Sequence, residues 1–214
     1  SRDGRRIYFC SFRSGVGALY QKPADGSQPE ELLYEPNAYF AVPNSESPDG
    51  RFLMFSLQAP GTDGDVWLLP LSGPRVPIPY VQTPSIDWSG DISPDGHWAT
   101  YQSGEFGVQE VYVQSFPTPG KRFQISTEGG HGPGWVNGGR EIIYFAPPDK
   151  IMAVDVQTSP SFQAGKPHLL FTINKDWNIA GAPDGQHFVM EVPPGDAPPP
   201  TYTILLNWTA ALRR

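Results

Sequence analysis

The chain has almost no cysteine, and this scarcity excludes several kinds of protein. Cys10 is the only cysteine, so an internal disulfide framework cannot form. The spacings typical of strong metal sites, His-x-His, Cys-x-x-Cys and His-Glu-x-x-His, are also absent. Because Cys10 ends an apolar run that begins at Ile7, we expect it to be a buried, small hydrophobic residue.

Long apolar runs and an excess of positive charge are missing as well. No stretch approaches the ~20 apolar residues of a membrane-spanning helix, and the first residues show no signal-peptide pattern. The formal net charge is −7 and the basic residues are dispersed, so the surface repels phosphate backbones. We therefore expect no membrane span and no nucleic-acid partner. The compartment stays open between the cytoplasm and an extracytoplasmic location such as the periplasm.

Glycine, proline and aromatic residues are abundant together. The chain has 23 Gly and 25 Pro among 214 residues, yet aromatic residues reach 13%. A disordered chain is poor in aromatic residues, whereas short aromatic-rich strands joined by many tight turns need all three. The composition predicts an all-β protein.

A turn motif recurs at a regular interval, and each copy precedes a strand-like apolar run. The copies are Ser1-Arg2-Asp3-Gly4, Ser47-Pro48-Asp49-Gly50, Ser93-Pro94-Asp95-Gly96, a degenerate Asn137-Gly138-Gly139, and Ala182-Pro183-Asp184-Gly185. Their last glycines, at positions 4, 50, 96, 139 and 185, lie 43 to 46 residues apart. Proline presets the first corner of a β-turn, aspartate caps it, and glycine supplies the left-handed position.

Each repeat unit predicts four strands. Two apolar strands follow the turn, a more polar strand such as residues 75–78 comes next, and a short segment before the following turn completes the set. Four strands at this period are typical of a β-propeller blade. We predict one domain over residues 1–214 with about five four-stranded blades. The units span approximately 1–40, 41–85, 86–130, 131–175 and 176–214.

The first and last units are incomplete by this count. The first lacks its innermost strand and the last lacks its outermost strand, so we expect an N-terminally truncated propeller. Closure as a small five-bladed ring, further blades upstream, and a homodimer through the open blade edges are the alternatives.

The Ser-Pro-Asp-Gly turns followed by aromatic-rich strands resemble the TolB-type propeller, which is built from Pro-Asp-rich relatives of WD40 repeats. This resemblance covers essentially the whole chain. Residues 111–117, 123–127 and 206–212 more narrowly resemble the C-terminal propellers of acidobacterial-type Ser/Thr protein kinases. The resemblance implies a sensor or protein-interaction module attached to a kinase. It does not imply kinase activity, because the Gly-rich loop, His-Arg-Asp and Asp-Phe-Gly motifs are absent.

Four titratable residues stand near the predicted innermost strands, which line the channel of a propeller. Glu46, Asp87, Asp91 and His131 can converge there. One imidazole with carboxylates suits a divalent cation: Ca²⁺ or Mn²⁺ with mainly oxygen ligands, or Zn²⁺ with a second histidine. With His131 and Asp91 as catalytic candidates, such a site would activate water for ester or phosphoester hydrolysis. Alternatively, His131 decorates a Gly-rich loop and the carboxylates are solvated.

Four aromatic residues fall in segments that look like loops. Tyr80, Trp88, Phe106 and Trp177 would bind peptides or sugars by stacking if they lie on one propeller face. The alternative is that they pack over the blade edges.

The leading prediction is a non-catalytic propeller that binds a protein or small-molecule ligand on one face, as a sensory or scaffolding part of a larger bacterial protein. The alternative is a metal-dependent hydrolase with its site in the channel. Whether the four titratable side chains surround one ion distinguishes the two.

Overall fold

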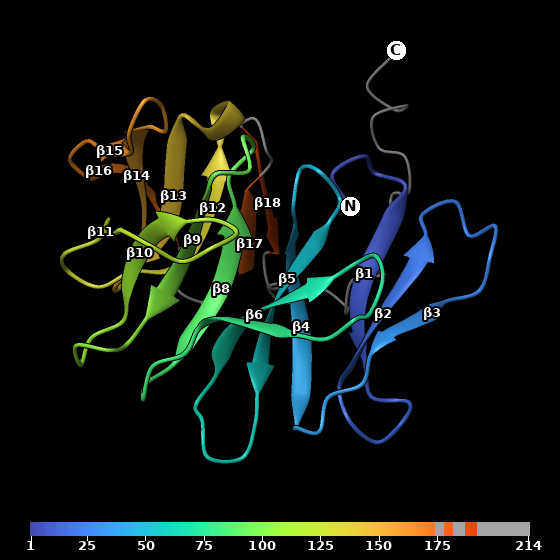
Figure 1. Ribbon diagram of the computed structural model, residues 1–214. Helices are drawn as coiled ribbons and strands as arrows, with labels where there is room; N and C mark the ends of the chain where they lie inside the picture. The colour runs from blue at the N-terminus through green and yellow to red at the C-terminus, as the bar shows by residue number, and fades with distance from the viewer. Residues whose placement is uncertain (174–177, 182–186, 192–214) are drawn as a thin grey trace, which may run out of the picture.

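The structure is a computed structural model that describes residues 1–173, 178–181 and 187–191 (Figure 1). Its strands form antiparallel sheets in which neighbours largely follow chain order. The first three sheets contain β1 (Arg6–Ser11), β2 (Ala18–Pro23) and β3 (Glu31–Tyr34); β4 (Phe40–Glu46), β5 (Phe52–Gln58), β6 (Asp65–Pro70) and β7 (Ile78–Val81); and β8 (Asp87–Ile92), β9 (Trp98–Ser103), β10 (Glu110–Ser115) and β11 (Arg122–Gln124).

The remaining strands form two further sheets. They are β12 (His131–Val136), β13 (Glu141–Ala146), β14 (Lys150–Gln157), β15 (Gln163–Ala164) and β16 (His168–Thr172), followed by β17 (Asn178–Gly181) and β18 (Phe188–Glu191). The predicted all-β class and its four-stranded blades are confirmed. Within the described ranges, the 3-10 turn η1 (Asn137–Gly139) is the one helical element.

Three of the predicted turns share one hydrogen-bond network. In the copy at 47–50, the Gly50 N–H donates to the Ser47 carbonyl at 2.8 Å, with Gly50 at a φ of 68°. The Ser47 hydroxyl donates to Asp49 Oδ1 at 2.6 Å and accepts the Phe52 N–H at 2.9 Å. The copies at 1–4 and 93–96 repeat these contacts. Since glycine adopts positive φ without steric cost, each copy directs the chain into its next strand.

The degenerate fourth turn is closed differently. Asn137 and Gly138 have φ values of 53° and 66° and form η1. The Arg140 guanidinium donates to the Asn137 side-chain oxygen at 2.9 Å and to its carbonyl at 3.1 Å. An arginine that donates to Asn137 therefore closes this turn, in place of the serine and aspartate that accept backbone N–H groups in the other copies.

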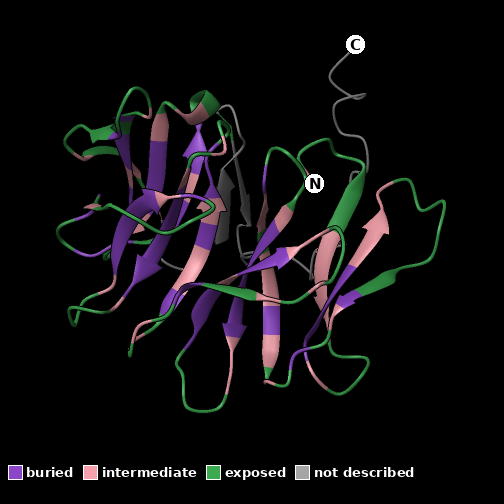
Figure 2. Ribbon diagram, in the orientation of Figure 1, coloured by how far each residue is buried: buried purple, intermediate pink, exposed green. Residues whose placement is uncertain are grey.

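Apolar side chains of the middle strands fill the spaces between neighbouring sheets. Met54 of β5 packs in one cluster with Tyr101 of β9, and Val113 of β10 packs in another with Ile142 of β13. All four are at most 1% exposed. Figure 2 shows buried residues along these strands. Because the middle strands are covered on both faces, the centres of their sequences are apolar.

The first two sheets also meet through the backbone. The Gly17 N–H donates to the Tyr39 carbonyl at 3.0 Å, and the Ala41 N–H donates to the Gly17 carbonyl at 2.8 Å. A Cβ atom at Gly17 would lie 2.2 Å from the Phe40 Cβ. This close approach requires glycine.

Successive connections alternate between two ends of the sheets, because the strands run antiparallel in chain order. We call the end that carries the turns at 1–4, 47–50, 93–96 and 137–139 the turn face. The opposite end, with the hairpin loops at 12–17, 59–64, 104–109 and 147–149, is the loop face. In Figure 1 the β4–β5 turn lies at the top and the β5–β6 loop at the bottom.

One predicted outer strand is displaced. Residues 75–78 were expected to form it, but β7 begins only at Ile78. Pro77 has no N–H to donate to the ladder. Arg75 instead contacts the first sheet, donating to the Leu32 carbonyl at 3.2 Å and to Glu31 at 2.8 Å.

The homodimer through open blade edges was expected at the ends of the propeller. Among the described strands, β1 pairs with β2 alone, so pairing of its other edge with a second copy stays a prediction. In the part of the chain that the structure describes, no helix is long and apolar enough to span a bilayer.

Candidate functional site

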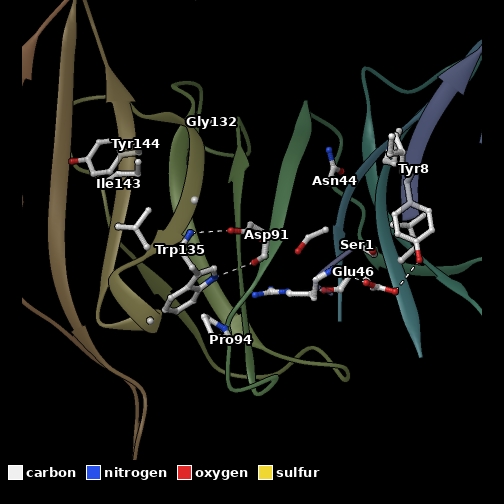
Figure 3. Close-up of a pocket in the computed structure, with 18 of the residues that line it drawn as sticks. Ser1, Tyr8, Asn44, Glu46, Asp91, Pro94, Gly132, Trp135, Ile143 and Tyr144 are labelled. Atoms are coloured by element: carbon white, nitrogen blue, oxygen red, sulfur yellow. Dashed lines mark hydrogen bonds between the residues drawn. The ribbon is translucent and has the colours of Figure 1, made fainter. Parts of the chain in front are cut away.

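A cavity of about 960 Å³ lies beside the inner strands β4, β8 and β12 and reaches the turn face at Ser1 and Pro94 (Figure 3). Its lining includes the polar side chains of Glu46 and Asp91 and the indole of Trp135. These three residues come from three blades. They meet because the inner strand of each blade ends at the turn face.

Glu46 at the end of β4 is held from two sides. Its Oε1 accepts the Tyr8 hydroxyl proton at 2.8 Å, and its Oε2 accepts the Arg2 N–H at 2.8 Å. The Arg2 guanidinium donates to the carbonyls of Glu46, at 3.0 Å, and Ile92. Arg2 occupies the turn position that proline occupies at 48 and 94. Among these three turns, the first therefore places a charged side chain at the cavity from this position.

Asp91 connects β8 to β12. Its Oδ2 accepts the Trp135 backbone N–H at 2.9 Å, and its carbonyl accepts the indole N–H at 3.0 Å. Burial raises the pKa of Asp91, and the bonds from Trp135 and Ser45 and the charge of Arg2 oppose that rise. Asp91 therefore fixes both the backbone and the indole of Trp135 at the wall of the cavity (Figure 3).

Asp87 and His131 lie at the other end of their strands. Asp87 begins β8 and is separated from Asp91 by a β-bulge at Ser89; the two residues pair with Ser103 and Thr100 of β9, three residues apart, which corresponds to about 10 Å along an extended strand. Asp87 is fully buried, and its Oδ2 accepts the Thr83 N–H at 2.7 Å. His131 begins β12, is exposed, and stacks on the Phe145 ring at 5.3 Å between centroids. The desolvation that accompanies this packing lowers the pKa of His131.

The expected convergence of the four residues is therefore not observed. Glu46 and Asp91 line the cavity, whereas Asp87 and His131 do not. In residues 1–173, 178–181 and 187–191, no three His, Cys, Asp or Glu side chains come close enough to hold a metal ion. The proposed Ca²⁺, Mn²⁺ or Zn²⁺ centre and the hydrolase that depends on it gain no support from this geometry.

The predicted binding aromatics separate into three groups. Tyr80 is buried in β7 and its hydroxyl donates to the Ser115 carbonyl at 2.9 Å, so its expected loop position was wrong. Trp88 lies in strand β8 rather than in a loop and is half-buried against Phe40, whereas Phe106 is 69% exposed in a hairpin loop. Trp177 lies outside the described residues.

Sequence reasoning missed Arg2 and Tyr8 as parts of the cavity. Asn44, on the same inner strand as Glu46, and Trp135, on the neighbouring inner strand β12, also line the cavity. Arg2 was overlooked because it stands at a turn position that usually holds proline. A charged residue at a turn position that usually holds proline was the sequence signal that could have identified Arg2 as part of the cavity.

No protein-family model and no curated protein match the chain. Among solved structures, TolB from Acinetobacter baumannii matches with a TM-score of 0.71 and 20% identity, over 87% of this chain and 45% of that one. A protein named for TolB from Agrobacterium tumefaciens matches with a TM-score of 0.66 and 16% identity, over 80% and 62%. An auxiliary nutrient binding protein from Bacteroides thetaiotaomicron has a TM-score of 0.59 and 12% identity, over 86% and 43%.

These similarities show the fold. The chain folds as a TolB-type β-propeller, as its Ser-Pro-Asp-Gly turns predicted. It spans 62% and 45% of the lengths of the two TolB-named chains. The link to a kinase stays a prediction.

Proposed function

We propose that this TolB-type propeller is a non-catalytic binding module that holds a small polar ligand or peptide end in the cavity beside β4, β8 and β12. One observation carries the proposal: a cavity of about 960 Å³ combines carboxylates from two blades with an indole from a third. Concave sites with a few convergent polar groups are the usual places for ligands.

The bonding of the lining groups favours a ligand that donates hydrogen bonds. Each carboxylate can accept about four hydrogen bonds, and Glu46 and Asp91 use only part of that capacity on protein donors. The Arg2 guanidinium is engaged with the Glu46 and Ile92 carbonyls. We therefore expect an amine or another cationic group to be preferred over an anion.

The larger context follows from the resemblance alone. We propose that the module belongs to a larger bacterial protein and acts as a sensor or scaffold linked to a Ser/Thr kinase. The resemblance of residues 111–117, 123–127 and 206–212 to the C-terminal propellers of Ser/Thr protein kinases supports this link. Sequencing the gene upstream of residue 1 tests it, and a reading frame without a kinase domain on either side would count against it.

The test of the cavity uses a panel of small amines and amine-bearing peptides, screened by thermal shift and measured by calorimetry. Asp91→Asn keeps an acceptor for the Trp135 N–H but removes the charge, so it should weaken amine binding about tenfold or more. Gly134→Leu should block binding, because a Cβ at Gly134 meets only Asp91 Oδ2, at 3.9 Å, and longer atoms extend into the cavity.

Glu128→Gln on the loop face is the matched control for the loss of one carboxylate charge and should bind as the wild type does. An amine that binds both cavity variants with unchanged affinity would place its site elsewhere. A panel in which no compound binds would remove the proposal.

A further inference from the structure

Large apolar side chains are exposed at the loop face, the end of the molecule opposite the turns. They come from three successive blades and from the connections between them. These residues are Phe12, Tyr39, Ile86, Phe106 and Val108, which are 61%, 59%, 38%, 69% and 59% exposed. Exposed apolar side chains gathered at one end of a molecule mark interaction sites more often than scattered single residues do.

Ring contacts join part of this surface into a row. The Phe12 and Phe40 rings lie 6.2 Å apart, and Phe40 meets Trp88 edge-on at 6.0 Å. We call these three residues the aromatic row. Its three residues come from the first three blades: Phe12 follows β1, and Phe40 and Trp88 lie where β4 and β8 begin. On the next blade, His131 begins β12 at the same end and stacks on Phe145.

The β5–β6 loop holds the Trp88 end of the row in place. A Cβ atom at Gly64 would lie 2.6 Å from the Trp88 ring, so the backbone of the β5–β6 loop packs directly against the indole. The Asp87 N–H also donates to the Gly64 carbonyl at 3.0 Å. Rigid aromatic side chains lose little entropy on binding, which suits them to anchor a partner.

The loop face also carries exposed acidic side chains. Glu35, Asp63 and Glu128 are exposed on connections at the loop face, and none of them forms an ion pair within the described residues. Arg13, the nearest basic residue in the β1–β2 loop, is paired with Glu30. The loop face therefore combines exposed aromatic side chains with three carboxylates that lie outside ion pairs, beside Lys150 at the start of β14 and an Arg122 guanidinium that already covers the Phe106 ring.

We propose that the loop face is a docking surface for a segment of a partner protein that carries lysine or arginine beside apolar residues. Cationic groups bind over aromatic faces and pair with the acidic rim, while apolar residues cover Phe12 and its neighbours. This surface is separate from the cavity of the proposed function, so the two fail or succeed independently.

The experiment selects a random-peptide phage library against the whole chain, and then measures synthetic copies of the enriched peptides by fluorescence anisotropy. The enriched peptides should carry at least two basic residues with aromatic or aliphatic neighbours. Their affinity should fall as salt is raised, because exposed charge pairs are screened. Phe12→Ser and Asp63→Lys should each weaken binding about tenfold, the loss expected for an anchor residue.

Two matched variants on the turn-face side serve as controls. Val76→Ser removes an apolar side chain that is 66% exposed, and Asp25→Lys reverses an exposed charge. Both should bind the peptides as the wild type does, and Asp91→Asn should also leave this binding unchanged.

Several results would overturn the proposal. These are a selection that enriches no peptide, enrichment of acidic or uncharged peptides, equal losses in the turn-face controls, or displacement of the peptide by the neutral sugar maltohexaose. The last result would show a carbohydrate site on the same aromatic residues.

Discussion

At each well-formed turn, a serine hydroxyl bonds with groups that the adjoining backbone leaves unpaired. Ser93 is fully buried, and its hydroxyl donates to Asp95 Oδ1 at 2.5 Å and accepts the Trp98 N–H at 3.0 Å. The sequence pattern predicted that proline, aspartate and glycine form the turn. The structure shows that the serine before them completes the network.

Ser93→Ala should therefore destabilise the propeller. The substitution leaves the Trp98 N–H and the Asp95 carboxylate without their shared partner, at a cost of about 2 kcal/mol in the free energy of unfolding. Urea denaturation measures it. Ser14→Ala, at an exposed serine in the β1–β2 loop, should change stability by less than about 0.5 kcal/mol. Equal values for the two variants would show that the hydroxyl network adds nothing.

At the scale of the elements, the sequence predicted the middle strands well and the outer strands less well. The centres of the middle strands, such as 53–55 and 111–113, are apolar because sheets cover them on both sides. The outer strand β7 is exposed at Ile78 and Pro79, so no apolar pattern marks where it begins. Its start depends on Arg75 binding the first sheet, a contact across 44 residues that local patterning does not reveal.

The contact between β2 and β4 depends on the absence of a side chain at Gly17. Gly17→Ala would force a Cβ to within 2.2 Å of Phe40 Cβ, and such overpacking costs about 3 kcal/mol. Hydrogen exchange should show faster opening of β1–β3 than of β8–β11. Gly104→Ala, whose Cβ would meet ordinary contacts no closer than 3.5 Å, is the control. Uniform loss of protection in all sheets would mean that the first blade does not open separately.

At the scale of the whole molecule, the sequence placed candidate residues on inner strands but could not say at which end. Asp87 and Asp91 share β8, yet the first lies toward the loop face and the second beside the cavity. The two residues are four positions apart in the sequence, yet they pair with opposite parts of β9, at Ser103 and Thr100. The grouping of Glu46 and Asp91 was therefore predictable, and the separation of Asp87 and His131 required the strand directions.

Carboxyl groups with a lowered pKa and those with a raised pKa make the free energy of unfolding change with pH in opposite directions. The Ser47 hydroxyl lowers the pKa of Asp49, so this residue stabilises the fold above about pH 4 and loses that effect as pH falls through its folded pKa. Burial raises the pKa of Asp87, and the charge of Asp65 adds to the rise. Asp87 therefore lowers stability as pH rises from about 4 through its folded pKa.

Asp87→Asn should remove that loss, because the amide oxygen still accepts the Thr83 N–H and no charge is buried. We expect the variant to be more stable than the wild type at pH 7, with a difference that shrinks toward pH 4. Urea denaturation at several pH values measures this. A difference that is constant across the range, or a less stable variant at pH 7, would contradict the assignment.

The local nature of the Ser-x-Asp-Gly network has a consequence for the order in which the chain folds. Its side-chain bonds join residues no more than five positions apart, so little chain entropy is lost in closing each one. Hairpins of this kind form on the order of 1–10 μs, before distant blades find each other. Folding then becomes a set of fast local closures followed by slower docking of finished hairpins, and the rate of the whole depends on the docking.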